Sequence, residues 1–274
     1  MFAVEDRERL WLPLLCSLTA EEPSWLVWKN VDSALHGVGD IDSAAAPESW
    51  PMVVSVFEKW VGENQLLPTI ACRHIPGGLN LVTAKPGERS LLELSVKNTK
   101  AWRGSTLFGL NDLQALAEQD PRGFRRLRPG GEGVFKLLLN GVRWGGRPNW
   151  SGLHAKKVPE LLQTDPAGVA MAAALFDDRR NDVLSLADAV VAGRWDPAAA
   201  GRIERAALRE TLLHPQSSWG RLRFRVVTVR SCPVLKALLL HERLRPCDER
   251  QWLDAVRQAH PGAPETVPSQ RGAR

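Results

Sequence analysis

Two aspartates one residue apart, Asp40 and Asp42, are the residues whose type and spacing most directly suggest chemistry in this chain. They end the stretch LHGVGDID, in which Gly37 and Gly39 leave room for a phosphate group to approach the backbone. On a β-strand, residues two apart point to the same face, so both carboxylates would project together. Such carboxylates repel each other unless a cation lies between them, and Mg²⁺ is commonly held by one or two carboxylates together with substrate phosphates. An isolated DxD is more often a solvated turn, so the neighbouring elements have to decide between the two interpretations.

Those neighbouring elements predict a sheet that would position the aspartates. WLVWKN (25–30) is a short apolar run typical of a buried strand, and GDIDSA (39–44) predicts a second strand beside it. Residues 47–65 predict a helix with one apolar stripe, in which Pro51 is tolerated because it falls in the first turn. LLPTIACRHI and LNLVTA, joined by PGG, predict a hairpin, and RSLLELSVK (89–97) predicts one more strand.

Helical signals dominate the chain from about residue 109 to about residue 260. The clearest one predicts a helix over 131–145 with an apolar face. The stretch 221–230 fits strand alternation and an amphipathic helix equally well. Residues 261–274 are rich in Pro and Gly without a core-forming pattern, which predicts a disordered tail. Further helices are predicted at 151–163, 167–176, 181–193, 197–213 and 246–259.

The order of these elements, together with WLVWKNVDSALHGVGDIDSA, resembles the nucleotidyltransferase superfamily typified by DNA polymerase β, whose signature reads hxhh(K/R)…GxDIDhhh. The resemblance covers about residues 10–110. It implies an α+β fold with a small mixed β-sheet nucleotidyltransferase core and flanking helices over 1–108, followed by an α-helical domain over 109–260 and the tail over 261–274.

In that family the paired aspartates bind two Mg²⁺ ions, and a third acidic residue on a later strand completes the site. The resemblance therefore assigns catalytic and metal-binding roles to Asp40, Asp42 and Glu93, with Mg²⁺ or Mn²⁺ as cofactor and an NTP as substrate. The family usually holds the triphosphate with Gly-Ser or Gly-Gly, where this chain has Lys29 and Asn30. Lys29, Asn30 and Gly39 are the expected nucleotide-binding residues of this half.

Family members often add a basic side chain from the helical half. On the predicted helix over 131–145, Lys136, Asn140 and Arg143 fall at i, i+4 and i+7, opposite the apolar stripe. These three residues are candidates for contacting the triphosphate, with a solvated polar face as the alternative. Lys97, Lys100 and Arg103, which follow the Glu93 strand, are expected at the surface and are secondary candidates to face the site.

Net charge and arginine content favour anionic partners. The chain has 274 residues, a formal charge of +5 and a pI of about 9.3. The run RGFRRLRPGG (122–131) could receive an anionic acceptor such as an RNA end, although such runs are more often solvated loops.

Several classes of protein are disfavoured by the sequence. No apolar run approaches a membrane span, and the acidic N-terminus does not resemble a secretory signal. The four cysteines are far apart, which disfavours zinc ribbons and disulfide frameworks and favours the cytoplasm. No GxSxG, P-loop or Rossmann glycine motif is present.

Three functions therefore remain open. The first is a Mg²⁺-dependent nucleotidyltransferase that moves a nucleoside monophosphate from an NTP to a hydroxyl of a small molecule, a protein or an RNA end. The second is a nucleotidyltransferase-fold protein that has lost catalysis and serves as a binding or scaffold module. The third is a basic nucleic-acid-binding protein that uses its arginine-rich segments without any chemistry.

Overall fold

The computed structural model describes residues 4–37, 39–72, 77–87, 91–213 and 241–243. The predictions for 221–230, 246–259 and the tail 261–274 lie outside the described residues. Among the helices that the structure describes, none is long and apolar enough to cross a membrane.

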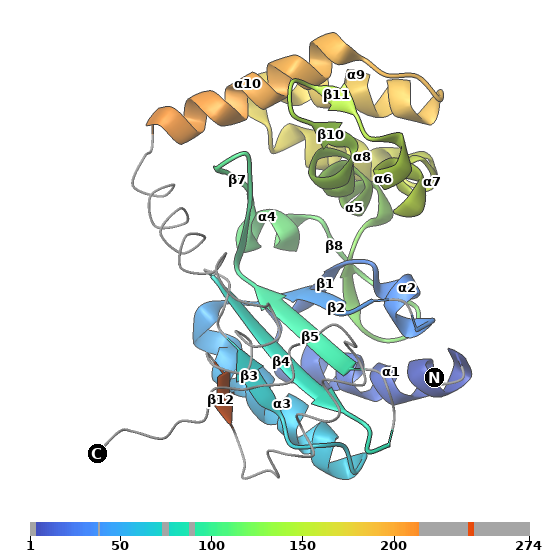
Figure 1. The fold of residues 1–274 in the computed structure, drawn as a ribbon, viewed down its shortest axis with the longest axis vertical. Helices are drawn as coiled ribbons and strands as arrows, with labels where there is room; N and C mark the ends of the chain where they lie inside the picture. Colours follow the sequence, from blue (N-terminus) through green and yellow to red (C-terminus); the bar gives the residue numbers. More distant parts are fainter. Residues whose placement is uncertain (1–3, 38, 73–76, 88–90, 214–240, 244–274) are drawn as a thin grey trace, which may run out of the picture.

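A mixed eight-stranded sheet forms the lower half of the molecule (Figure 1). Two of its strand pairs, β2 with β5 and β1 with β9, are parallel, and the other pairs are antiparallel. The prediction of a mixed α/β architecture with flanking helices is confirmed at this level. In spatial order the strands are β12 (His241–Arg243), β3 (Ile70–Cys72), β4 (Gly78–Ala84), β5 (Leu91–Lys97), β2 (Ile41–Ala44), β1 (Leu26–Lys29), β9 (Arg125–Leu127) and β8 (Ala117–Gln119).

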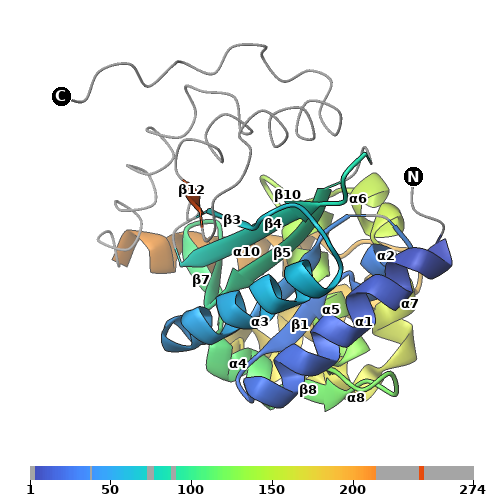
Figure 2. The ribbon, with the colours of Figure 1, turned by 90° about the horizontal axis from the view of Figure 1, so that it is seen from below.

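One face of this sheet is covered by α1 (Val4–Glu21) and α3 (Trp50–Glu63), which lie side by side (Figure 2). Their apolar stripes bury large aromatic side chains, and the rings of Trp11 and Trp60 stack with centroids 5.1 Å apart. Helix α3 starts after a 3₁₀ turn, η1 (Pro47–Ser49), and has Pro51 in its first turn, as the sequence predicted. Alternate residues of β2 and β5, such as Ile41 and Leu94, point into this core.

The opposite face of the sheet packs against the helical half. A second hydrophobic core combines Leu26 and Trp28 of β1 with Phe108 and Phe135, and the rings of Trp28 and Phe108 lie 5.0 Å apart. Two short ribbons border this half: β6 (Thr99–Trp102) with β7 (Ser105–Gly109), and β10 (Val142–Arg143) with β11 (Arg147–Pro148). Its helices are α4 (Leu110–Ala115), α5 (Pro129–Lys136), the π-helical turn η2 (Leu137–Gly141), α6 (Trp150–Ala155), α7 (Val158–Thr164), α8 (Pro166–Ala174), the 3₁₀ turn η3 (Asp177–Arg179), α9 (Arg180–Val191) and α10 (Pro197–Leu213).

Two features of the helical half differ from the predicted pattern. Strands β8 and β9, from residues 117–127, join the main sheet although they follow the boundary expected at residue 109. The helix predicted over 131–145 is wrong in its second part, because α5 ends at Lys136 and the chain then forms η2 and the β10–β11 hairpin. Gly145 and Gly146 make the turn of that hairpin with φ of +77° and +67°, a conformation that glycine adopts readily.

Candidate active site

The register of the sheet brings the three predicted acidic residues onto one face. Strands β2 and β5 run parallel with Asp42 opposite Ser95, so Asp42 shares a face with Glu93, and Asp40 precedes β2 close enough for its charge to act on Glu93. Because residues two apart share a face, Asp42 projects on the same side as Asp40. The polar face of β2 and β5 therefore carries three carboxylates, while the apolar face packs on α1 and α3.

The pKa values of Asp40 and Glu93 are both raised. Burial, followed by the negative charges of Asp40 and Asp42, raises the pKa of Glu93 to about 7. Burial and the charge of Asp42 also raise the pKa of Asp40. Near neutral pH this cluster is therefore strained by its own negative charge and would be stabilised by a cation.

Lysine ammonium groups supply part of the missing positive charge. Lys29 Nζ lies 2.9 Å from Asp42 Oδ2 and Lys97 Nζ lies 3.6 Å from Asp42 Oδ1, while the Asp42 side chain is only 3% exposed. Lys100 lies close enough for burial and the charges of Lys97 and Lys29 to lower its pKa to about 8. Lys97 is also buried, contrary to the expectation that it would lie at the surface.

The carboxylate oxygens of Asp40, Asp42 and Glu93 are of the type that binds hard divalent cations. Mg²⁺ and Mn²⁺ prefer carboxylate oxygens, and Asp42 Oδ2 is buried without a directed hydrogen bond although Lys29 lies beside it. In the part of the chain that the structure describes, no three His, Cys, Asp or Glu side chains are already arranged to hold a metal ion. The three carboxylates thus fit Mg²⁺ or Mn²⁺ by ligand type, and the Lys29 ammonium group lies beside the Asp42 carboxylate.

A buried arginine holds the loop that leads into the acidic cluster. Gly37 and Gly39 both have φ of +92°, so the loop requires glycine at these positions. Arg7 of α1 donates from Nε to the carbonyl of Ala34 at 3.1 Å and from Nη2 to the carbonyl of Gly39 at 2.8 Å. The sequence analysis did not identify Arg7. Its position three residues before Leu10, on the apolar side of α1, is the sequence signal that could have indicated a buried arginine.

Glu132 binds two of the predicted nucleotide-binding residues. Asn30, which precedes α2 (Val31–Leu35), donates its backbone N–H to Glu132 Oε1 at 2.8 Å. Lys136 is buried and its Nζ lies 2.5 Å from the same oxygen. Glu132 therefore binds the backbone amide of Asn30 and the ammonium group of Lys136, two residues that the family resemblance predicts to bind the triphosphate.

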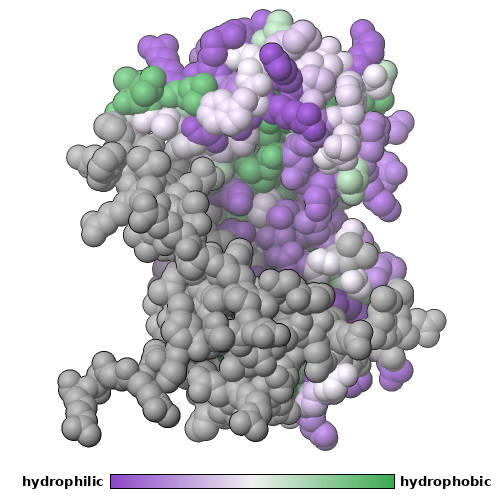
Figure 3. Space-filling view, viewed as in Figure 1, coloured by the Kyte–Doolittle hydropathy of each residue, from purple (hydrophilic) through white to green (hydrophobic). Residues whose placement is uncertain are grey.

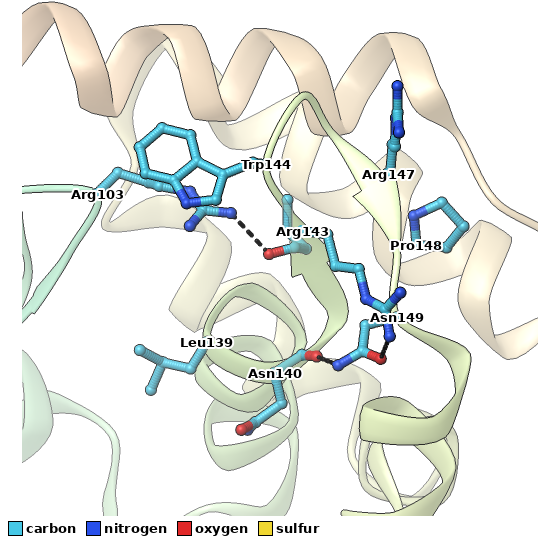
Figure 4. A pocket seen from close by; sticks show the side chains of 9 residues that line it. Arg103, Leu139, Asn140, Arg143, Trp144, Arg147, Pro148 and Asn149 are labelled. Carbon is cyan, nitrogen blue, oxygen red and sulfur yellow. Dashed lines mark hydrogen bonds between the residues drawn. The ribbon is translucent and has the colours of Figure 1, made fainter.

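Asn140 and Arg143 line a different cavity, beside the β10–β11 hairpin of the helical half (Figure 4). Arg143 Nη2 donates to Asn149 Oδ1 at 2.7 Å, and the amide of Asn149 donates to the carbonyl of Asn140 at 2.7 Å. The structure thus brings Lys29 and Gly39 to the region of the acidic cluster, and places Asn140 and Arg143 elsewhere.

The arginine-rich run is bound within the chain. Arg122 lies 2.6 Å from Asp32 and 2.8 Å from Asp120, and Arg128 lies 2.7 Å from Asp165. These pairs tie the β8–β9 segment and the start of α5 to the rest of the molecule. Arg126 also pairs with Asp120, and Arg125 donates to the neutral side chain of Gln114.

No family model, curated protein or solved structure matches this chain. Figure 3 shows hydrophilic side chains gathered on the surface below the helical half.

Proposed function

We propose that this protein is a nucleotidyltransferase with a core of the DNA polymerase β type. It would transfer a nucleoside monophosphate from an NTP to a hydroxyl acceptor on a small molecule, a protein or an RNA end. One observation carries the proposal: the register of parallel strands β2 and β5 puts Asp42 and Glu93 on one face of the sheet, and Asp40 lies close enough for its charge to act on Glu93. Burial and the charge of neighbouring aspartates raise the pKa of both Asp40 and Glu93, which is typical of functional acidic clusters.

Asp40, Asp42 and Glu93 would hold Mg²⁺ or Mn²⁺. When bound, the cation would neutralise phosphate charge and lower the pKa of the acceptor hydroxyl. The three carboxylates would keep this charge at a fixed point on the sheet, because β2 and β5 are both internal strands.

Lysine side chains would hold the triphosphate. Lys29 is 24% exposed and faces Asp42 from the neighbouring strand, so an entering phosphate can compete with Asp42 for its ammonium group. Lys97 and Lys100 add positive charge from β5 and β6. In the transfer, the acceptor oxygen bonds to the α-phosphorus as the bond to pyrophosphate breaks, and the protein contributes mainly positioning and charge.

A second candidate function is a binding or scaffold module that lacks catalysis. The observation that favours it is the engagement of the site by the protein's own groups: Lys29 and Lys97 flank Asp42, and Glu132 takes the Asn30 amide. The basic nucleic-acid-binding alternative loses its main support, because the arginines of 122–128 are bound internally.

Label transfer from each NTP tests the proposal. The protein is incubated with each α-labelled NTP, Mg²⁺ or Mn²⁺, and small hydroxyl compounds, protein or RNA as acceptors. Asp42→Asn should lower transfer at least about a hundredfold, since it removes one of the cation-holding charges. Glu63→Gln, an exposed acid at the end of α3, is the matched control and should leave transfer unchanged.

Each outcome selects one function. Equal transfer by Asp42→Asn and the parent protein would exclude the acidic cluster as the active site. NTP binding without transfer to any acceptor would support the binding module.

A further inference from the structure

A cavity of about 800 Å³ lies beside the β10–β11 hairpin and combines positive charge with an exposed aromatic ring (Figure 4). Arg103, Arg143 and Arg147 contribute guanidinium groups to its lining, and Trp144 contributes the indole. Its volume lies within the range of roughly 300–1,000 Å³ that is usual for small-ligand sites.

The Trp144 ring is presented by a fixed hairpin. The side chain is 65% exposed, which is unusual for tryptophan, and the Arg103 guanidinium lies 4.3 Å from the ring centroid. The turn is anchored at Gly146, whose carbonyl accepts a hydrogen bond from Trp195 Nε1 at 2.9 Å and whose N–H donates to Glu204 at 2.7 Å. The turn is therefore fixed, and the ring lies against Arg103 on one side with most of its surface exposed.

Two of the arginines carry positive charge that no acid of the described chain compensates. Arg103 is paired with Glu204 at 2.7 Å, whereas Arg143 binds only the neutral side chain of Asn149. Arg147 has no partner among the residues that the structure describes.

The hairpin register makes this charge costly for the free protein. Arg143 and Arg147 are directly opposite each other on the antiparallel strands β10 and β11. Like charges on opposed strand residues destabilise a strand pair. In Figure 4 the Arg143 guanidinium points toward Asn149 and the Arg147 guanidinium points away from it, so Arg147 is the one placed to receive an anion without giving up a side-chain hydrogen bond.

We infer that this cavity binds a nucleoside monophosphate unit, with its base against Trp144 and its phosphate at Arg147. Guanidinium groups pair well with phosphate oxygens, and nucleobases stack on exposed aromatic rings. Asn140 and Asn149, which also line the cavity, provide polar groups for the sugar or the base edge. The unit can come from a free nucleotide or from the end of an RNA strand, and its binding does not depend on the transfer reaction proposed above.

Calorimetric titration in EDTA tests this site by itself, because chelation removes any metal-dependent binding at the acidic cluster. The probes are AMP, a short single-stranded RNA and inorganic phosphate. Trp144→Ala should weaken binding of AMP or RNA at least about tenfold, and Trp144→Phe should restore most of it, because stacking needs only an aromatic face. Arg147→Glu should weaken binding at least as much and reduce its salt dependence.

Two control variants locate the site. Arg180→Glu makes the same charge change at an exposed position at the start of α9 and should bind like the parent protein. Glu63→Gln should also leave binding unchanged, because Glu63 is an exposed acid at the end of α3.

The three probes give distinct outcomes. RNA binding more than about tenfold tighter than AMP binding identifies a strand end as the source, and equal affinities identify a free nucleotide; both support the site. Three results would overturn it: no binding of AMP or RNA to the parent protein, unchanged binding by Trp144→Ala, or phosphate binding as tight as AMP binding.

Discussion

Asp42 shows how the acidic cluster is balanced at the scale of single residues. A carboxylate that is only 3% exposed would be strongly disfavoured without compensation, and Lys29 and Lys97 provide it. Asp40 and Glu93 are less well compensated, since burial and neighbouring carboxylates raise the pKa of both. The cation proposed above would balance the charge that the lysines leave uncompensated at these two carboxylates.

Removal of the Lys29 ammonium should make the protein depend on divalent cations. Lys29→Met leaves Asp42 with one ammonium group 3.6 Å away. We therefore expect the free energy of unfolding, measured in urea, to be about 1–2 kcal/mol lower than that of the parent protein. Millimolar Mg²⁺ should restore more stability to Lys29→Met than it adds to the parent protein. Lys59→Met, at a 77% exposed position, is the control and should show neither effect. Equal Mg²⁺ responses in all three proteins would contradict a cation site at Asp42.

The stability of the metal-free protein should depend on the charge of Glu93. Its pKa is raised from 4.5 to about 7 in the folded chain, so the unfolded chain releases this proton first as the pH rises. Between about pH 4.5 and pH 7, Glu93 is ionised in the unfolded chain while it stays protonated in the folded chain, so the stability of the fold decreases progressively. Above about pH 7 the deficit stays constant. In EDTA, Glu93→Gln should match the parent protein near pH 4 and exceed it by about 1–3 kcal/mol near pH 8. Urea unfolding at both pH values measures this, and a constant difference would show that Glu93 does not titrate as described.

At the scale of elements, the close approach of α5 and α8 depends on Gly130. A Cβ atom at this position would lie 2.1 Å from the carbonyl oxygen of Asp165 and 2.5 Å from the amide nitrogen of Val169, both backbone atoms. The neighbouring Gly131 has space, because the nearest atom to its Cβ position is a side-chain carbon of Leu116 at 3.4 Å. The two glycines thus have different roles on the same helix.

Two alanine variants should separate these roles. Gly130→Ala should lower the free energy of unfolding by about 2–3 kcal/mol, since backbone of α8 has to move. Gly131→Ala should be neutral or raise it by up to about 1 kcal/mol through better helix propensity. Chemical denaturation of both variants gives the comparison, and equal effects would mean that α5 and α8 are less closely packed than the structure shows.

The sequence could predict elements with clear apolar patterns but not their mutual register. Helix α3 and strands β1 and β5 were predicted because each carries an apolar face or run, and β2 was predicted from the spacing of its aspartates beside β1. Strand β9 was missed, since Arg125 and Arg126 conceal a strand that is held by ion pairs and a neighbouring strand. The location of Lys97 beside Asp42 was missed for a related reason, because only the pairing of β2 with β5 brings the two together.

At the scale of the whole molecule, the main sheet is shared by two hydrophobic cores. Ile41 and Leu94 belong to the core under α1 and α3, whereas Leu26 and Trp28 belong to the core of the helical half. Phe124, from the segment between β8 and β9, is fully buried in the first core. Each half of the chain therefore completes the packing of the other.

A fragment containing only residues 1–108 should consequently fail to fold by itself. It would lack β8, β9 and Phe124, it would expose Leu26 and Trp28, and it would lose the Glu132 carboxylate that binds the Asn30 amide. Small domains retain only a few kcal/mol of stability, so the loss of two strands and one face of the core exceeds what the fragment can tolerate. We expect no cooperative thermal transition by circular dichroism for the fragment, and a tryptophan emission shifted to longer wavelength than that of the full chain. A cooperative transition in the fragment would instead show that the first 108 residues are an independent domain, and that the arginine pairs of β8 and β9 only attach the helical half to it.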